Sequence, residues 1–358
     1  MYLCYNIEVI KDIAVSASGE VNYMNTLVTG GAGFIGRWVV KRLLSENNSV
    51  TVLDNLSNGR LENIEEFKDN PHFKFIGGDI KDKNKLNKVF EDKFDIIYHL
   101  AASINVQDSI NDPETTFFND ALGTFNILEK ARYQMFGKKG RMDGNSWVLD
   151  SNEDTYPCKI VFMSTCMVYD VSKDEGISEI HPVKPVSPYG GSKIAAENMV
   201  LSYYNTYKLP TVVIRPFNTY GPFQKTGGEG GVVAIFINNV LHGRDINIYG
   251  SGEQTRDLLY VKDCADFVVE SGYSQKVNGQ IVNAGTSRDV TINELADIIC
   301  GSKIKINHVK HIHPQSEIMK LKCDYSRAKK LIGWQPKYTL EQGIEETRKW
   351  IEGTKLLK

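Results

Sequence analysis

The chain has 358 residues, which is enough for one large domain or two ordinary ones with a sizeable core. Its 41% hydrophobic and 24% charged residues are typical of soluble globular proteins, and its net charge of −2 gives no basic surplus for nucleic acid. No apolar run approaches the length of a membrane span, and the N-terminal sequence predicts no signal peptide. Six cysteines are scattered without a CxxC pair, so we expect reduced thiols, a cytoplasmic location and no metal site.

The first third of the chain alternates short apolar runs with stretches of helical periodicity. Residues 1–23 precede the first strong element, and we interpret them as an N-terminal extension. Strands are predicted at residues 26–30, 50–59, 73–80 and 94–102. Strands that alternate with helices indicate a parallel sheet covered on both faces, so we expect a Rossmann-like, doubly wound α/β fold.

The rest of the chain continues this pattern and then becomes mixed. A strand is predicted at residues 210–222, and helices at residues 120–136, 187–207, 326–334 and 340–351. Residues 137–157 are polar and rich in turn formers without periodicity, so we interpret them as an inserted surface loop. From residue 223 onward, helices and short strands mix.

The sequence TGGAGFIG places Gly30, Gly33 and Gly36 between a predicted strand and a predicted helix. Glycines there permit a tight turn and let a pyrophosphate approach the backbone, beside a helix N-terminus that attracts negative charge. The second strand ends at Asp54, where an acid binds ribose hydroxyls and disfavours a 2′-phosphate. The pattern predicts an NAD site. Arg60 nearby leaves NADP open, and glycines that serve only the turn are the structural alternative.

A later apolar run, CKIVFMSTCMVYD, predicts a buried strand that becomes polar at Ser164, Thr165 and Cys166. The sequence SPYGGSK then places Tyr189 four residues before Lys193, on one side of a predicted helix. A free tyrosine has a pKa near ~10, but a neighbouring ammonium and the positive nicotinamide of NAD⁺ would lower that pKa. Each motif alone is common in strands and on surfaces, whereas both together after a dinucleotide loop indicate an active site.

With these motifs in place, the sequence resembles the extended short-chain dehydrogenase/reductase family, in its nucleotide-sugar epimerase/dehydratase branch. The resemblance covers residues 25–350 and rests on TGGAGFIG, DNLSNG, GDI, HLAA, STCMVY, SPYGGSK, RPFNTYGP, QTRDLLYV and AKKLIGWQPKYTLEQGI. It implies an NAD-binding Rossmann domain and a smaller mixed α/β C-terminal domain that binds the nucleotide sugar. The NAD-binding domain is predicted at residues 24–222, which include the 137–157 insertion, and part of residues 257–285 returns to it. The domain that binds the nucleotide sugar is predicted at residues 223–256 and 286–358.

The resemblance implies that the glycine loop, the ends of the following strands and the catalytic helix together hold NAD. The residues implied are Gly30, Gly33, Phe34, Ile35, Gly36, Asp54, Asn55, Ser57, Asn58, Gly59, Asp79, Ile80, Leu100, Ala101, Ala102, Asn119, Ser164, Tyr189, Lys193 and Pro216.

Substrate contacts are implied by the same resemblance. Thr165 would hydrogen-bond the sugar oxygen that is oxidised, and Asn218 would lie near the substrate phosphates. Arg256 would clamp the diphosphate, because a planar cation fits phosphate well. The alternative for Arg256 is an ion pair with Asp257 or Asp263.

The C-terminal part departs from the family pattern. Relatives often place a second diphosphate-binding arginine before a Gly-Asp pair, and HIHPQSEIMK at residues 311–320 has none. His311, His313 or Lys320 are candidates to take its place. We expect these histidines and His308 to be polar neighbours of an anion rather than metal ligands.

The implied reaction begins with hydride transfer from a sugar carbon to NAD⁺ while Tyr189 takes the hydroxyl proton, which gives a 4-keto sugar. Dehydratases of this branch usually place Asp-Glu directly after Thr165, where this chain has Cys166 and Met167. Methionine transfers no proton, so the sequence favours an epimerase. The first candidate is a 4-epimerase that acts on a UDP-sugar. Some dehydratase-like relatives carry a cysteine there, so Cys166 is either a catalytic acid or a small buried residue.

Three alternatives remain beside the epimerase: a nucleotide-sugar 4,6- or 5,6-dehydratase, a non-catalytic regulator that binds NAD or sugar nucleotides, and an NADPH-consuming reductase. The intact catalytic residues argue against the regulator, and Asp54 argues against the reductase. The resemblance further implies a homodimer that pairs through the helices around residues 120–134 and 189–207. The expected partner is a nucleotide-diphosphate sugar, with neither nucleic acid nor membrane.

Overall fold

The structure is a computed structural model that describes residues 23–137, 140–143, 146–149, 155–170, 176–227, 231–301, 304–310 and 318–356. Residues 1–22 of the predicted extension therefore lie outside the described residues.

Seven strands of the described chain form one parallel sheet, in the order β12-β8-β7-β4-β1-β2-β3. Their bounds are β1 (Asn25–Thr29), β2 (Ser49–Asp54), β3 (Phe73–Gly77), β4 (Ile96–His99), β7 (Lys159–Met163), β8 (Thr211–Pro216) and β12 (Gln280–Ala284). In register, Thr29 lies opposite both Leu53 of β2 and His99 of β4, so these carboxyl ends meet at one edge. The predicted doubly wound α/β fold is confirmed.

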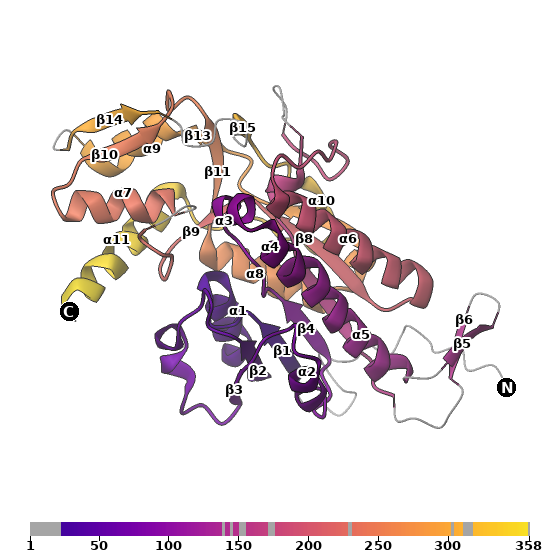
Figure 1. The fold of residues 1–358 in the computed structure, drawn as a ribbon. Coiled ribbons are helices and arrows are strands. Elements are labelled where there is room, and N and C mark those ends of the chain that lie inside the picture. The colour runs from indigo at the N-terminus through magenta and orange to yellow at the C-terminus, as the bar shows by residue number, and fades with distance from the viewer. Residues whose placement is uncertain are drawn as a thin grey trace.

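Helices cover both faces of this sheet (Figure 1). The helices are α1 (Phe34–Ser45), α2 (Lys83–Val89), α3 (Val106–Asn111), α4 (Pro113–Phe117), α5 (Gly123–Phe136), α6 (Pro188–Tyr207), α7 (Val232–Leu241), α8 (Val261–Tyr273), α9 (Ile292–Cys300), α10 (Ser326–Ile332) and α11 (Leu340–Leu356). One apolar cluster joins α1 and α8 to the sheet, and a second joins α2, α5 and α6 to its other face. The core is therefore two apolar layers separated by the sheet.

A smaller mixed region follows the sheet in the chain. Its strands are β9 (Asn218–Tyr220), β10 (Ile246–Tyr249), β11 (Thr255–Tyr260), β13 (Asp289–Thr291), β14 (Ile306–Val309) and β15 (Lys320–Leu321). A separate apolar cluster packs α7, α9 and α11 around β10 and β11, at the end of the molecule away from α2 and α5 (Figure 1). Between these elements the chain returns to the main sheet, where β12 pairs with β8.

Local signals explain where the helices of the site begin. The Ser187 side chain caps α6 by accepting a hydrogen bond from the Gly190 N–H (3.2 Å), and Pro188 occupies the first turn. Asp112 caps α4 in the same way, with Pro113 next. The Ser187 cap thus fixes the start of the helix that carries the SPYGGSK motif, and the Asp112 cap fixes the start of α4.

Several predicted elements are shorter than the sequence suggested, among them the strands predicted at residues 50–59, 73–80 and 94–102, which are β2, β3 and β4. The run at residues 158–170 is a strand only to Met163, and a 3-10 turn at Cys166–Val168 follows it. The helix predicted at residues 120–136 is regular only from Gly123, because a π-helical turn at Phe118–Leu122 joins α4 to α5. Such turns arise from tertiary packing, which apolar periodicity does not report.

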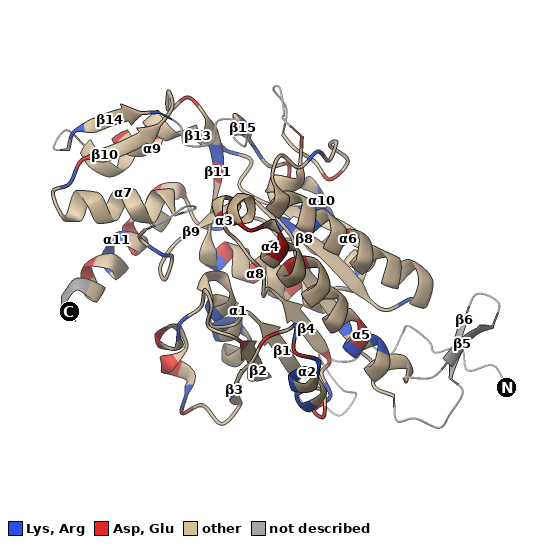
Figure 2. Ribbon diagram, in the orientation of Figure 1, with Lys and Arg blue, Asp and Glu red and all other residues tan. Residues whose placement is uncertain are grey.

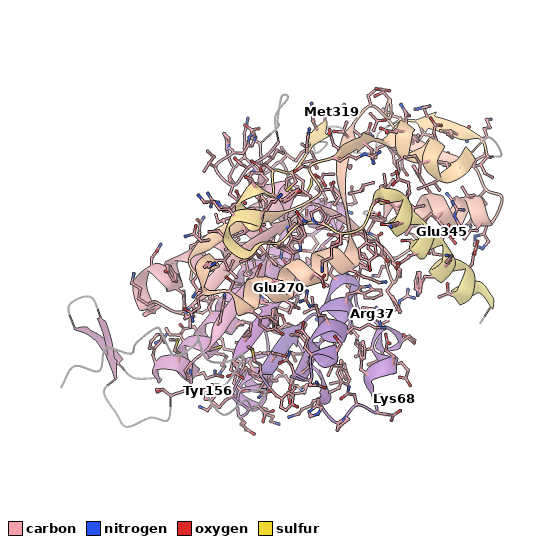
Figure 3. The ribbon with its side chains drawn as sticks, turned by 180° about the vertical axis from the view of Figure 1, so that it is seen from behind. Arg37, Lys68, Tyr156, Glu270, Met319 and Glu345 are labelled. Atoms are coloured by element: carbon pink, nitrogen blue, oxygen red, sulfur yellow. The ribbon has the colours of Figure 1, made fainter. Side chains whose placement is uncertain are left out.

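The insertion at residues 137–157 was predicted as a loop, and this was wrong for part of it. β5 (Gly140–Asp143) and β6 (Ser146–Leu149) form an antiparallel pair that projects beyond α5 (Figure 1). The sequence between them is rich in turn formers, which suits a hairpin. After the hairpin, Tyr156, which is labelled in Figure 3, contacts the main sheet. Its hydroxyl donates to Oδ1 of Asp95, the residue before β4 (2.7 Å).

Acidic and basic residues are scattered among one another over the molecule (Figure 2). Some of them form ion pairs between α1 and α8. Arg42 of α1 pairs with Asp266 (2.7 Å) and Glu270 (2.5 Å) of α8, and Glu270 is labelled in Figure 3. At the C-terminal end of α8, just beyond Glu270, the buried Lys159 Nζ donates to the carbonyl oxygens of Ser271 (2.8 Å) and Ser274 (2.5 Å). Among the helices that the structure describes, none combines the length and apolar character needed to cross a membrane.

Candidate active site

The glycine loop lies between β1 and α1 and comes very close to the loop after β4. Gly30 has a φ of +74°, and a Cβ at this position would lie 2.8 Å from the backbone nitrogen of Ala101. A Cβ on Gly36 would overlap the carbonyl oxygen of Gly30. Gly33 is the N-cap of α1 and provides no side-chain hydrogen bond to the helix. The loop therefore presents backbone at a helix N-terminus, which is an arrangement suited to phosphate.

Asp54 ends β2 and holds this loop in place. Its carboxylate accepts hydrogen bonds from the N–H groups of Ala32 (3.0 Å) and Leu56 (2.8 Å). Burial raises the pKa of Asp54, and these two backbone hydrogen bonds oppose the rise. Each oxygen retains a further lone pair, so the carboxylate can still accept from ribose hydroxyls.

One open pocket lies over the carboxyl ends of the central strands. It is lined by Gly30, Gly33, Phe34, Ile35, Gly36, Leu53, Asp54, Asn55, Ser57, Asn58, Gly59, Gly78, Asp79, Ile80, Leu100, Ala101, Ala102, Ile104, Asn119 and Met163. The predicted cofactor residues from Gly30 to Asn119 all lie in this lining. Ligands of open α/β sheets bind at this edge, so the pocket has the position of a dinucleotide site.

The other four predicted cofactor residues lie outside that lining. Ser164 directly follows Met163, and Pro216 is the last residue of β8. Both residues are buried. Tyr189 and Lys193 lie in the first turns of α6, with exposures of 7% and 3%. Lys193 Nζ donates to the carbonyl oxygen of Met163 (3.0 Å), which links the lysine to a residue of the pocket wall.

The ionisation of the Tyr189–Lys193 pair reflects its burial. Burial raises the pKa of Tyr189, Asp120 raises it further, and a hydrogen bond with Thr165 lowers it. Burial lowers the pKa of Lys193, whereas the carboxylates of Asp120 and Glu197 raise it. Tyr189 therefore remains a neutral phenol unless a further positive charge is placed beside it. The cationic nicotinamide ring of NAD⁺ would supply such a charge and favour the phenolate.

Thr165 and Cys166 lie directly after β7. The Thr165 hydroxyl hydrogen-bonds Tyr189 and accepts a hydrogen bond from the Met167 N–H (3.2 Å). Cys166 is 2% exposed, and burial raises the pKa of its thiol to about 12 while Arg256 lowers it. The thiol is therefore protonated at neutral pH, which allows it to donate a proton and prevents it from acting as a resting base.

The predicted substrate residues Asn218 and Arg256 lie on neighbouring strands, β9 and β11, which pair in parallel. Arg256 Nη1 donates to the carbonyl oxygens of Thr255 and Ile318, both at 2.8 Å. The buried Oδ1 of Asn218 has no hydrogen-bond partner within the described residues. A buried acceptor without a partner is costly, so this amide is suited to a bound ligand.

The carboxylates considered as partners of Arg256 are held by backbone groups. Asp257 accepts from the N–H groups of Thr286 (2.7 Å), Ser287 (2.9 Å) and Cys323 (3.0 Å). Asp263 accepts from the N–H groups of Lys337 and Tyr338, both at 3.0 Å. These contacts give both acids a structural role.

Of the residues considered around the missing second arginine, the structure describes Lys320 and His308, and neither of them lines the pocket. His308 of β14 is exposed and contacts Asn293 Oδ1 through Nε2 (3.0 Å). Lys320 begins β15, and His311 and His313 lie outside the described residues. Within the part of the chain that the structure describes, no group of three His, Cys, Asp or Glu side chains could hold a metal ion.

Sequence reasoning missed several residues of the site. Leu53, Gly78, Ile104 and Met163 line the pocket, and Asp120 and Glu197 act on the Lys193 ammonium. The sequence did carry one signal for the last two, because each is an acid in an otherwise apolar helical stretch. Glu197 also follows Lys193 by four residues, on the same helix face.

Comparison with known proteins gives the family. Residues 27–347 match the family described as GDP-mannose 4,6 dehydratase. UDP-glucose 4-epimerase of Mycolicibacterium smegmatis is 36% identical over 90% of this chain and 97% of its own length. Among solved structures, the X-ray structure of Pal from Bacillus thuringiensis has 59% identity and a TM-score of 0.85, covering 92% of this chain and all of Pal.

A dehydratase is also similar in structure. dTDP-glucose 4,6-dehydratase of Bacillus anthracis, solved in complex with NAD, has 30% identity and a TM-score of 0.79, over 94% of this chain and 100% of the dehydratase. The match to the family spans nearly the whole chain, and the relatives are matched over nearly their whole length. The chain therefore belongs to the GDP-mannose 4,6 dehydratase family, in the nucleotide-sugar epimerase/dehydratase branch of the extended short-chain dehydrogenases/reductases.

Proposed function

We propose that the protein is an NAD-dependent nucleotide-sugar epimerase that acts through a 4-keto sugar, with a UDP-sugar as the first candidate substrate. The observation that carries this proposal is the contact of Thr165 with Tyr189, beside a Lys193 that is anchored to the wall of the dinucleotide pocket. The relatives that match over most of their length include UDP-glucose 4-epimerases.

The residues of the pocket fit NAD. Only hydrogen fits at Gly30 and Gly36, so the loop leaves room for a pyrophosphate beside the N-terminus of α1. Asp54 offers carboxylate oxygens to ribose hydroxyls and would repel a 2′-phosphate. NAD, when bound, supplies an acceptor and donor of hydride. We therefore expect denatured protein to release mainly NAD(H) rather than NADP(H).

In this mechanism Tyr189 takes the proton of the sugar 4-hydroxyl and later returns it. Thr165 positions the same oxygen by a hydrogen bond, since its hydroxyl already contacts the phenol. Lys193 holds a buried positive charge that favours the phenolate. Epimerisation needs no further proton donor, so a methionine at position 167 is no hindrance.

A second candidate function is a nucleotide-sugar 4,6- or 5,6-dehydratase, and one observation favours it. Cys166 lies next to Thr165, influences the pKa of Tyr189 and keeps its proton at neutral pH. A protonated thiol at this position could donate to a leaving hydroxyl. Dehydratases are also among the relatives of this chain.

A panel of UDP-, dTDP-, GDP- and CDP-sugars, analysed by mass in water and in deuterium oxide, tests the proposal. An epimerase gives an isomer of unchanged mass and no solvent deuterium, because the hydride returns to its own carbon. Loss of one water with deuterium in the product overturns the epimerase and supports the dehydratase.

Cys166→Ala provides the matched variant for this assay. For an epimerase we expect a small loss of turnover, because only packing changes. For a dehydratase we expect the reaction to stop after the first step, with reduced cofactor visible by its absorbance. A stalled Cys166→Ala protein would therefore contradict the epimerase.

We further propose that two copies associate as a homodimer. Phe117, Phe118 and Leu122 support this, since their side chains are 51%, 41% and 37% exposed on α4 and the turn after it. Adjacent exposed apolar residues mark interaction surfaces. We also propose a cytoplasmic location, which is supported by the five described cysteines being free and buried.

A further inference from the structure

The π-helical turn between α4 and α5 holds a carboxylate inside the protein. Asp120 lies in the middle of this turn and is 1% exposed. Its Oδ1 accepts a hydrogen bond from the Ser103 N–H, and its Oδ2 accepts one from the Ser192 hydroxyl, both at 2.7 Å. Burial raises the pKa of Asp120, whereas the Lys193 ammonium and these two hydrogen bonds lower it and so support the charged carboxylate. π turns are also frequent at functional sites.

These partners place Asp120 between the cofactor pocket and the catalytic helix. Ser103 follows the pocket residue Ala102, and its hydroxyl accepts a hydrogen bond from Asn119 (2.9 Å), which also lines the pocket. Ser192 precedes Lys193 in α6 and donates to the carbonyl oxygen of Tyr189 (2.8 Å) as well. α4 and the turn after it pack against α6 (Figure 1).

The other titratable groups around the pair from neighbouring elements contribute less charge. His99 of β4 contacts Thr29 Oγ1 and Thr124 Oγ1, and burial together with Lys193 lowers its pKa to about 3, so it is neutral. Cys166 is also neutral at neutral pH. Glu197, one turn beyond Lys193, is engaged in a bidentate pair with Arg215 (2.8 and 2.5 Å).

We propose that Asp120 is a positioning residue whose buried negative charge sets the pH range in which Tyr189 and Lys193 operate. This inference rests on the proposed function for the roles of the pair. The charge acts on both groups in one direction, because an adjacent anion makes each of them hold its proton more tightly. Removing it should move both ionisations to lower pH.

Asp120→Asn is the variant that removes the charge with little change of shape. The amide oxygen can still accept from the Ser103 N–H, and the amide nitrogen can donate to the Ser192 hydroxyl. Asp112→Asn is the matched control, since it removes the same charge from the same segment at the exposed cap of α4. Asp120→Glu keeps the charge and serves as the conservative variant.

The readout is the rate of cofactor reduction after mixing with the reactive sugar nucleotide, followed by absorbance from pH 5 to pH 10. In Asp120→Asn we expect the acidic limb, set by Tyr189, and the basic limb, set by Lys193, to shift together toward lower pH. Asp112→Asn and Asp120→Glu should keep the limbs of the unchanged protein. A profile of Asp120→Asn that superimposes on that of the unchanged protein overturns the proposal.

A second measurement requires no sugar and separates this inference from the proposed function. NAD-loaded protein and NAD-loaded Tyr189→Phe are titrated with base, and the difference between their absorbances gives the phenolate of Tyr189. The same pair of titrations is repeated in the Asp120→Asn background. A lower midpoint in the Asp120→Asn background supports the inference even if no sugar nucleotide reacts. An unchanged midpoint overturns it, whatever the panel of sugars shows.

Discussion

At the scale of single residues, the hydrogen bond from Lys193 to the Met163 carbonyl places α6 beside both parts of the proposed site. The lysine reaches the wall of the cofactor pocket, while Tyr189, one turn earlier, contacts Thr165. Both side chains are almost fully buried, so a small change of charge has a large effect on their ionisation. The same burial holds Cys166 protonated at neutral pH.

Tyr189→Phe removes the phenolic proton and leaves the ring in place. We expect turnover of the sugar nucleotide to fall at least about 10²-fold, since general acid–base groups contribute roughly 10²–10⁴-fold. The content of bound NAD should remain near that of the unchanged protein, because the glycine loop and Asp54 lie elsewhere. Activity close to that of the unchanged protein would show that Tyr189 is not the base.

At the scale of elements, the packing of α1 against β1 depends on the absence of a side chain at Gly36. A Cβ at this position would overlap the carbonyl oxygen of Gly30, which belongs to the loop that leads into the helix. A methyl group there requires the loop and the helix to separate. The pocket would lose its phosphate-binding geometry together with some of the core.

Gly36→Ala is therefore expected to lose bound NAD and to lower the midpoint of thermal unfolding. Gly353→Ala is the matched control, because it is also a glycine within a helix and a Cβ there meets nothing within 4 Å. That control should raise stability by about 0.5–1 kcal/mol, as alanine favours the helix. Retention of NAD by Gly36→Ala would contradict the assigned loop.

The end of α8 gives a prediction about pH. Burial lowers the pKa of Lys159 to about 7, whereas an unfolded lysine titrates near ~10.4. Between these values the unfolded chain binds the extra proton, so this lysine makes stability rise with pH, by at most about 1.4 kcal/mol per unit. A neutral amine still donates to both carbonyl oxygens at the helix end.

Urea unfolding of the unchanged protein and of Lys159→Met, measured at pH 6.5 and pH 8.5, tests this. The stability of the unchanged protein relative to the variant should increase at the higher pH. Lys74→Met, which changes an exposed lysine paired with Asp92, should show no such trend. An equal difference at both pH values would mean that Lys159 stays charged in the folded protein.

At the scale of the whole molecule, the protein has two parts: the main sheet with its helices, and the smaller mixed region. We expect each part to bind a different ligand. We propose that residues 24–222, with part of 257–285, hold NAD, and that residues 223–256 and 286–358 hold the nucleotide sugar. The lining of the pocket and the positions of Asn218 and Arg256 support this division. The exposed apolar residues on α4 lie outside both functions and are available for a second copy.

Light scattering should therefore report twice the mass of one chain. Phe117→Glu places a charge in the proposed contact and is expected to shift the mass toward that of a monomer. Ile180→Glu changes another exposed apolar residue, with 85% exposure, and should leave the dimer intact. A protein that is monomeric before any substitution excludes the contact.

The sequence was informative where function depends on local spacing. Gly30, Gly36 and Asp54 are separated by turn and strand lengths that the chain itself specifies, and the helix period alone puts Tyr189 beside Lys193. Residues that act through tertiary contacts could not be predicted in this way. Asp120 lies in a π turn and contacts Ser192 of α6, and Met163 contributes a carbonyl oxygen, which every residue has. Their roles depend on packing between elements far apart in the chain.

The return of the chain to form β12 has a consequence during synthesis. β8 is complete at residue 216, but the strand that pairs with its outer edge ends only at residue 284. A ribosome adding about 5–20 residues per second leaves this edge uncovered for several seconds while the intervening elements emerge. An open apolar strand edge can pair with other chains, so we expect the nascent protein to be prone to aggregation during this interval.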